Sequence, residues 1–145
     1  MNRSRHLTAA VLVLSLLPQA AFASDAQCSL RLDEGWARLP PMEMPVLGGF
    51  GILVNPCGTD ASVTGASSPD FEEVQVHETR HEDGMMRMRQ VESLAVPATG
   101  SATLEPGGLH LMLMRPVRAL ESGDEVKVVF TLADGGTVPA TLEVR

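Results

Sequence analysis

The hydrophobic positions of this chain fall in short segments, separated by turn signals of Gly, Pro, Asn, Asp and Ser that recur too closely for helices of ordinary length. The segments are rich in Val, Leu, Phe and Thr, and their spacing is typical of an antiparallel sandwich or barrel. We therefore expect an all-β fold. The pattern predicts strands over residues 51–54, 72–78, 85–94, 109–115, 125–132 and 137–144.

Two connections stand out between these segments. Asp134-Gly135-Gly136 separates two strand-like segments and predicts a hairpin that pairs the last two strands. Residues 40–49 combine three prolines and two methionines with little polar content, and they predict a loop laid over one end of the sandwich.

The alternation within residues 109–114 predicts which side chains share a face, because successive residues of a strand point to opposite sides. The three leucines of this segment fall on one side, which suits a core. His110, Met112 and Met114 fall on the other side, which we expect to lie on the outer face or near a strand end. A histidine and two methionines are unusual there.

Two further segments place the same residue types on a common side. In 85–89, Met86 and Met88 share one face and two arginines share the other. In 71–77, two valines fall on one side and His77 falls on the polar side. The three mature histidines thus lie beside methionine clusters.

Thioethers and imidazoles are neutral, soft ligands, and soft ligands select Cu(I) over Mg, Ca or Mn. Zinc sites more often use Cys, His and carboxylate. The residue types therefore favour copper, and nearby acidic residues would help to balance the charge of the ion. Methionine also fills gaps in hydrophobic cores. The alternation alone therefore predicts only a strand face suited to a soft metal, which contains His110 and Met112 and has Met114 as a further candidate.

The N-terminal residues 1–23 predict a secretory signal peptide, with Arg3 and Arg5 before an apolar run and cleavage after Ala23. The apolar run is shorter than the roughly 20 residues that span a bilayer, so we expect no membrane span. Residues 24–145 then form a single domain of 122 residues, exported to the periplasm.

The charge balance limits the partners of this domain. The chain has 11 basic and 18 acidic residues, and the signal contains two of the basic residues and none of the acidic ones, so the mature net charge is −9. Such a surface argues against nucleic acid and anionic membranes. A cation or a basic protein surface fits it better.

The chain has two cysteines, and an oxidising compartment predicts a structural disulfide between Cys28 and Cys57. A lipid tether on Cys28 is the alternative, but the residues before it, Ser24-Asp25-Ala26-Gln27, lack the small, apolar character expected of a lipid-modified cysteine.

The histidines and methionines follow a spacing that resembles the periplasmic copper chaperones of the PCuAC type. His77 is followed after ten residues by Met88, then after twenty-one residues by His110, and then by Met112. Flanking matches lie at Gly35-Trp36-Ala37-Arg38, at Gly84 and Met88-Arg89, and at residues 104–114. The resemblance covers nearly the whole mature chain.

This resemblance implies a cupredoxin-like antiparallel β-sandwich of Greek-key type that binds Cu(I) through His77, Met88, His110 and Met112. It also implies delivery of copper by ligand exchange to an acceptor, such as a cytochrome c oxidase subunit or a thioredoxin-fold metallochaperone. The cysteine pair is not part of the family motif. Weaker secondary sites could use His81, Met85, Met86, Met114 and the pair Met42 and Met44.

Two other functions remain open at this point. A blue-copper electron carrier needs a cysteine thiolate beside two histidines, and Cys57 precedes every mature histidine. A metal-free interaction module would use the methionines as a partner surface. We do not expect an enzyme, because the chain has no nucleophile elbow or phosphate-cradling loop.

Overall fold

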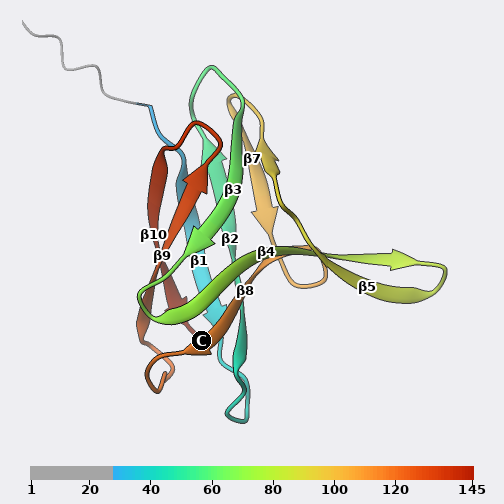
Figure 1. Ribbon diagram of the computed structural model, residues 1–145, viewed down its shortest axis with the longest axis vertical. Coiled ribbons are helices and arrows are strands. Elements are labelled where there is room, and N and C mark those ends of the chain that lie inside the picture. The colour runs from blue at the N-terminus through green and yellow to red at the C-terminus, as the bar shows by residue number, and fades with distance from the viewer. Residues whose placement is uncertain (1–27) are drawn as a thin grey trace, which may run out of the picture.

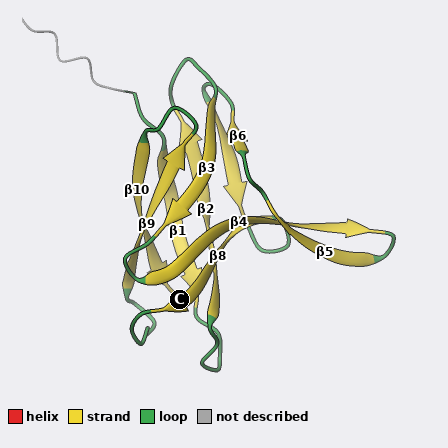
Figure 2. Ribbon diagram, viewed as in Figure 1, coloured by secondary structure: helices red, strands yellow, loops and turns green. Residues whose placement is uncertain are grey.

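The computed structural model describes residues 28–145, so the signal peptide predicted for residues 1–23 lies outside the described part. Within residues 28–145 all regular secondary structure is β (Figures 1 and 2). The strands are β1 (Arg31–Arg38), β2 (Val46–Asn55), β3 (Ala61–Ser67), β4 (Phe71–Glu82), β5 (Met85–Gln90), β6 (Leu94–Val96), β7 (Gly100–Leu104), β8 (Leu109–Pro116), β9 (Glu125–Leu132) and β10 (Thr137–Val144).

The strands form one sheet that closes on itself. Its order is β5-β4-β8-β2-β1-β10-β9-β3-β6, and an additional pairing of β3 with β4 joins the two ends of the central run into a barrel. β7 pairs with β2 beside this run. The expected all-β, cupredoxin-like architecture is confirmed, and so is the pairing of the last two strands. The pairs are antiparallel except for β1 with β10, which is parallel.

The hairpin of β4 and β5 extends away from the barrel (Figure 1). The first part of β4 pairs with β8 as far as Glu78, whereas residues from His77 to Glu82 pair with β5. At its tip the hairpin turns through Asp83 and Gly84, both of which have a positive φ. One long strand therefore belongs both to the barrel wall and to the projecting hairpin.

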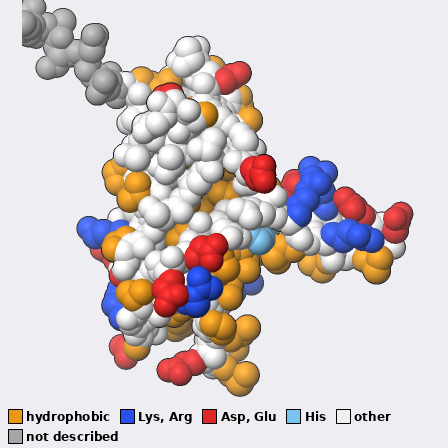
Figure 3. All heavy atoms as spheres, viewed as in Figure 1, with side chains coloured by type: hydrophobic (Ala, Val, Ile, Leu, Met, Phe, Trp, Pro, Cys, Tyr) orange, Lys and Arg blue, Asp and Glu red, His pale blue; other side chains and the backbone are white. Residues whose placement is uncertain are grey.

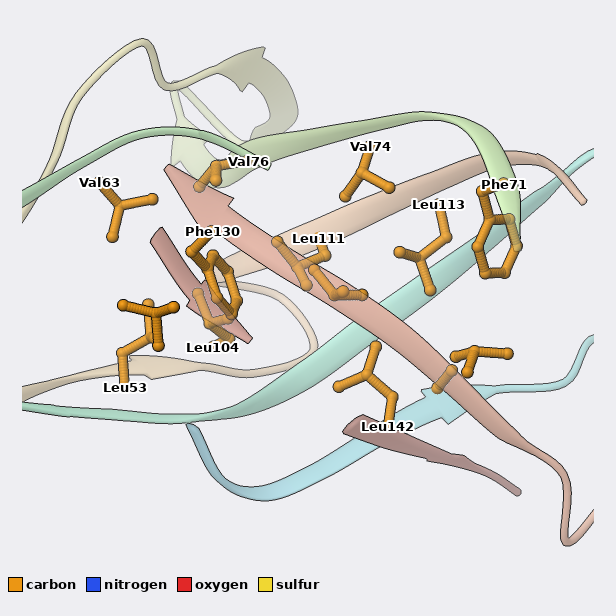
Figure 4. Close-up of a cluster of buried hydrophobic side chains, with 14 of the residues drawn as sticks. Leu53, Val63, Phe71, Val74, Val76, Leu104, Leu111, Leu113, Phe130 and Leu142 are labelled. Atoms are coloured by element: carbon orange, nitrogen blue, oxygen red, sulfur yellow. The ribbon is translucent and has the colours of Figure 1, made fainter. Parts of the chain in front are cut away.

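Apolar side chains from nearly all strands fill the barrel (Figure 4). Leu111 and Leu113 are fully buried there, as their side of the alternating segment predicts. Val74 and Val76 of β4 point into the same core. The faces of β4 and β8 that point away from this core are therefore available for the candidate ligand residues.

Several predicted boundaries differ from the structure. The predicted strand 85–94 is divided into β5 and β6, and β1, β3 and β7 lie outside the predicted ranges. A register shift between Asp33 and Trp36 interrupts the alternation of β1. β3 and β7 are poor in large apolar residues and are held by pairing with their neighbours. The predicted loop 40–49 ends at Pro45, because Gly48 and Gly49 lie inside β2. These glycines serve packing rather than a turn. A Cβ on Gly48 would lie 2.8 Å from the Phe50 ring, and one on Gly49 would lie 3.1 Å from the Leu111 Cβ.

The predicted disulfide is present, joining Cys28 to Cys57 with their Cα atoms 5.5 Å apart. The buried side chain of Asn55 orders the segment around it. Its amide donates hydrogen bonds to the carbonyls of Thr59 and Val96, and its oxygen accepts one from the Cys57 N–H. The disulfide fastens the N-terminal end of the described chain to the segment that follows β2.

Residues 28–145 contain no helix with the length and apolar character needed to cross a membrane.

Candidate metal centre

His77 and His110 are direct partners across the pair formed by β4 and β8. Their ring centroids are 6.1 Å apart. His110 is 5% exposed and His77 is half-buried. His110 is the second residue of β8, near a strand end as expected, and its imidazole is covered although it lies on the side of the strand opposite Leu111 and Leu113.

Strand β2 lies next to β8 in the sheet, and β1 lies next to β2. Gly48 of β2 is the partner of Met112, and the Phe50 ring lies across the position that a Gly48 side chain would take. Trp36 stacks at 4.6 Å from Phe50, and the Arg38 guanidinium lies over both rings. An aromatic cluster thus borders the side of β8 that carries the candidate ligands.

Each imidazole is fixed by one of its two ring nitrogens. The Nε2 of His77 lies 2.8 Å from the Oε1 of Gln75, and the Nδ1 of His110 lies 2.9 Å from the carbonyl oxygen of Gly108. Because both partners are acceptors, each of these nitrogens carries the proton and donates. The other nitrogen of each ring then holds a free lone pair.

Those two free nitrogens, Nδ1 of His77 and Nε2 of His110, are buried, and in the described part of the chain they are the buried side-chain polar atoms without a hydrogen-bond partner. Buried polar groups are normally satisfied, so such exceptions need an explanation. A histidine that binds a metal is neutral, and its second ring nitrogen usually donates a hydrogen bond to a carbonyl or side-chain oxygen. Both histidines have this arrangement.

A chain of polar side chains supports His77. The amide nitrogen of Gln75 donates to Glu73, and the Glu73 carboxylate accepts a hydrogen bond from Arg115 at 3.1 Å. With its nitrogen engaged, Gln75 presents its oxygen to His77. The Arg115 and Gln75 hydrogen bonds also hold the pKa of the Glu73 carboxyl below its ordinary value, so this carboxylate remains an acceptor.

Burial lowers the pKa of His77, and the neighbouring His110 lowers it further. The neutral form that a metal requires therefore persists to more acidic pH than in an exposed histidine.

The two methionines of the motif lie on the same face as the imidazoles. Met112 is the cross-strand partner of Gln75, two residues from His110 along β8. Met88 of β5 is the partner of Thr79, which is two residues from His77 along β4. Direct partners in an antiparallel sheet share a face, and diagonal neighbours remain within reach of long side chains. The structure thus brings all four predicted residues to one face of three adjacent strands.

The secondary candidates separate into three places. Met86 and His81 are partners on the hairpin, on the same face as Met88. Met114 lies at the opposite end of this face, as the partner of Glu73. Met85 points to the other face of the hairpin, and the pair Met42 and Met44 lies in the loop between β1 and β2.

The donor set is soft. Within residues 28–145, no group of three or more His, Cys, Asp or Glu side chains is arranged to hold a metal. Both cysteines of the chain are in the disulfide, so the thiolate of a blue-copper centre is absent from the site. What remains is two imidazoles and two thioethers, which suit Cu(I).

The sequence interpretation missed the residues that orient the imidazoles. Gln75 and Glu73 stand two and four residues before His77, which is the spacing of neighbours on one strand face. This spacing could have identified Gln75 and Glu73 as neighbours of His77. No feature of the sequence indicates that the Gly108 carbonyl accepts a hydrogen bond from His110.

Residues 30–144 match the family model described as putative lipoprotein LpqE-like. A putative lipoprotein of Leifsonia xyli subsp. xyli is 30% identical over 149 residues, covering 97% of this chain and 89% of the relative.

Solved structures of similar fold include PCuAC domains. The copper-bound PCuAC domain from PmoF2 is 20% identical and has a TM-score of 0.64, with 80% of this chain and 92% of that domain covered. The CuI form of DR1885 from Deinococcus radiodurans is 27% identical and has a TM-score of 0.60, with 87% of this chain and 85% of that chain covered. The apo form of the same protein is 24% identical with a TM-score of 0.62, and covers 99% of this chain and 96% of its own.

Proposed function

The chain belongs to the LpqE-like family, which is of the PCuAC type, and from this premise we propose that it is an exported chaperone that binds one Cu(I) ion through His77, Met88, His110 and Met112. The observation that carries this proposal is the pair of buried, unpartnered ring nitrogens on facing imidazoles. Solved relatives named for copper-bound and CuI forms support the choice of ion.

The fit of the four residues to Cu(I) follows from their chemistry. The hydrogen bond of each imidazole favours a tautomer in which the buried, unpartnered nitrogen keeps its lone pair, as a metal ligand requires. Thioethers add neutral, polarisable donors that do not compete with protons. The ion keeps its single positive charge, and the acidic mature domain, with a net charge of −9, offers a favourable surrounding field.

The exposures of the ligands suit transfer rather than storage. His110 is 5% exposed, whereas Met88 is 54% exposed. A chaperone has to hold its ion against water and yet release it to an acceptor. A site with one buried and one half-buried imidazole and an accessible thioether allows an incoming ligand to replace Met88 before the imidazoles dissociate.

The cellular role completes the proposal. The chain is exported to the periplasm, and it passes copper by ligand exchange to an acceptor of the cytochrome c oxidase assembly route, with no catalysed bond-making step. The lipoprotein description of the family agrees with export. In this chain, however, the Sγ of Cys28 is bonded to Cys57 and cannot carry a lipid while that bond exists.

An anaerobic titration of the purified chain with Cu(I), against a competing chromophoric chelator, tests the proposal. We expect one tightly bound equivalent. Combined replacement of His110→Gln and Met88→Leu should abolish tight uptake, while Met44→Leu in the exposed loop should leave it unchanged. Absence of tight uptake by the wild-type chain, or unchanged uptake by the double variant, would overturn the copper function.

A further inference from the structure

The hairpin of β4 and β5 has two chemically distinct faces. On one face lie Met86 and Met88 of β5, beside His81 and Thr79 of β4. This face is continuous with the one that carries His77. Of the described residues outside the four-residue site, His81 and Met86 are the imidazole and thioether that stand directly opposite each other.

The other face of the hairpin is charged. Glu78 forms ion pairs with Arg80 at 2.7 Å and with Arg89 at 3.4 Å, and Arg87 approaches Glu82 at 3.8 Å. The space-filling view shows this division, with blue and red side chains on one side of the projecting hairpin and orange ones along its other edge (Figure 3). The charged side chains are therefore engaged with one another on their own face, and the methionine face of the hairpin has no charged residue among its paired positions.

The register gives Met88 a position between two imidazoles. It is the partner of Thr79, so it lies one diagonal step from His77 on one side and one diagonal step from His81 on the other. Diagonal neighbours on a sheet face are about 7–8 Å apart at their Cα atoms, within reach of long side chains. Met86, the direct partner of His81, lies closer still, with about 4.5–5.5 Å expected between the Cβ atoms.

We propose that His81 and Met86, together with the shared Met88, form a second and weaker Cu(I) site at the tip of the hairpin, through which the ion enters and leaves the buried site. This inference rests on the proposed copper function. The geometry that supports it is a continuous row of soft donors, from His110 in the barrel wall to the solvent-exposed hairpin tip.

The transfer between the two sites is a ligand exchange in which copper stays Cu(I) throughout. Met88 keeps its sulfur–copper bond while His77, His110 and Met112 leave and His81 and Met86 bind. No proton or electron is transferred if His81 is neutral. The tip site is the weaker of the two because its donors are exposed, with Met86 at 65%. In addition, His81 has no side-chain hydrogen bond to a partner within residues 28–145 of the kind that holds His77 and His110.

The test uses the full chain with methyl-labelled methionine and ring-labelled histidine, titrated anaerobically with Cu(I) and followed by NMR. The first equivalent should shift the signals of Met88, Met112 and the two site imidazoles. The second equivalent should then shift Met86 and His81, and should shift Met88 again. A second equivalent that leaves Met86 and His81 unmoved, or that binds at Met114 or in the loop of Met42 and Met44, overturns the proposal.

Matched variants extend the test to transfer. The double variant H81Q and M86L should bind the first equivalent with unchanged affinity, lose the second, and deliver Cu(I) to the chelator more slowly than the wild type. Met85→Leu is the control, because Met85 is 55% exposed on the same strand but on the charged face. Equal transfer rates in the double variant and in the control would contradict the exit role.

The result separates this inference from the proposed function. If the wild-type chain binds one tight equivalent and no second, the tip site is wrong and the chaperone site stands. If it binds no Cu(I) at all, both are wrong. Met88→Leu adds a final check, since a shared ligand requires that this one change weakens both equivalents.

Discussion

His77 and His110 face each other across β4 and β8, with 6.1 Å between their ring centroids, and each turns a buried nitrogen without a partner toward the same face of the sheet. Two separate hydrogen bonds hold this arrangement, one to a side chain and one to the backbone. The strength of the site should therefore depend on residues that never touch the ion.

Gln75 is the first such residue. Gln75→Leu removes the acceptor of the His77 Nε2–H, so the imidazole can change its tautomer and orientation. We expect Cu(I) affinity to fall by about 10–100-fold, the usual effect of losing a partner of a metal-bound histidine. Chelator competition measures the loss. Nitrogen NMR of the ring should show the proton on Nε2 in the wild type and a mixture of tautomers in the variant.

Gln90→Leu is the matched control for that change. Gln90 is the cross-strand partner of His77 on β5 and is exposed, but its side chain does not hydrogen-bond to the imidazole. Its replacement should leave affinity and tautomer unchanged. Equal losses in the two variants would show that the polarity of the surface matters, rather than the specific hydrogen bond of Gln75.

The pH dependence of copper binding follows from His77. Its imidazole must be neutral to bind, and burial together with the nearby His110 lowers its pKa below the ordinary value of about 6.5. Protonation of His77 therefore begins to compete only at more acidic pH. We expect its contribution to affinity to be constant above pH 6.5 and to fall as the pH drops through the lowered pKa.

An NMR titration of the metal-free chain checks the sign of this shift. The His77 midpoint should lie below 6.5 in the wild type. His110→Gln removes the smaller of the two causes of the shift, the electrostatic effect of the neighbouring imidazole, so it should raise the His77 pKa part of the way toward the ordinary value, while burial still lowers it. A midpoint above 6.5 in the wild type, or no rise in the variant, would contradict the electrostatic account.

The disulfide should contribute to stability without contributing to the site. Cys28 and Cys57 are separated by 29 residues, and closing a loop of this length stabilises a fold by about 3 kcal/mol in the chain-entropy model. Replacing both cysteines with serine should lower the free energy of unfolding by about this amount, measured by urea denaturation. Cu(I) affinity should not change, because β4, β5 and β8 contain no cysteine.

Gly49 offers a test of the core. A Cβ added there would lie 3.1–3.3 Å from Leu111, Leu142 and Leu113, all fully buried. Gly49→Ala should destabilise the fold by about 1–3 kcal/mol, as overpacking does. Gly65→Ala in β3 is the control, since its Cβ would meet nothing within 4 Å. It should change stability by less than about 1 kcal/mol.

Much of the architecture could be predicted because period-two alternation is a local property. It correctly separated Leu111 and Leu113 from His110 and Met112, and it located the last two strands at their observed bounds. It gave no range for β1, where a register shift interrupts the alternation, or for β3 and β7, whose Ser, Thr, Ala and Gly carry little pattern. It also read Gly48 and Gly49 as turn residues, although tight packing requires them inside a strand.

The sequence proposes the members of the site but not their arrangement. The spacing shared with the family selected the four candidate residues, whereas the pairing of His77 with His110 depends on a register between strands that are far apart in the chain. The burial of His110 depends on packing between strands, which the alternation of residues along β8 does not indicate. The hydrogen bonds from His77 to Gln75 and from His110 to the Gly108 carbonyl depend on this register and packing, so they are seen only in the structure.

The position of His77 between β5 and β8 has a thermodynamic consequence. Its backbone is paired on both sides, to Gln90 and to His110, so the imidazole pair is assembled when the chain folds and not when a ligand arrives. Such preorganisation reduces the conformational entropy lost on association. The ordering that remains falls mainly on the flexible thioether of Met88, so metal-free and metal-bound forms should share one rigid barrel and differ in the motion of a single projecting hairpin.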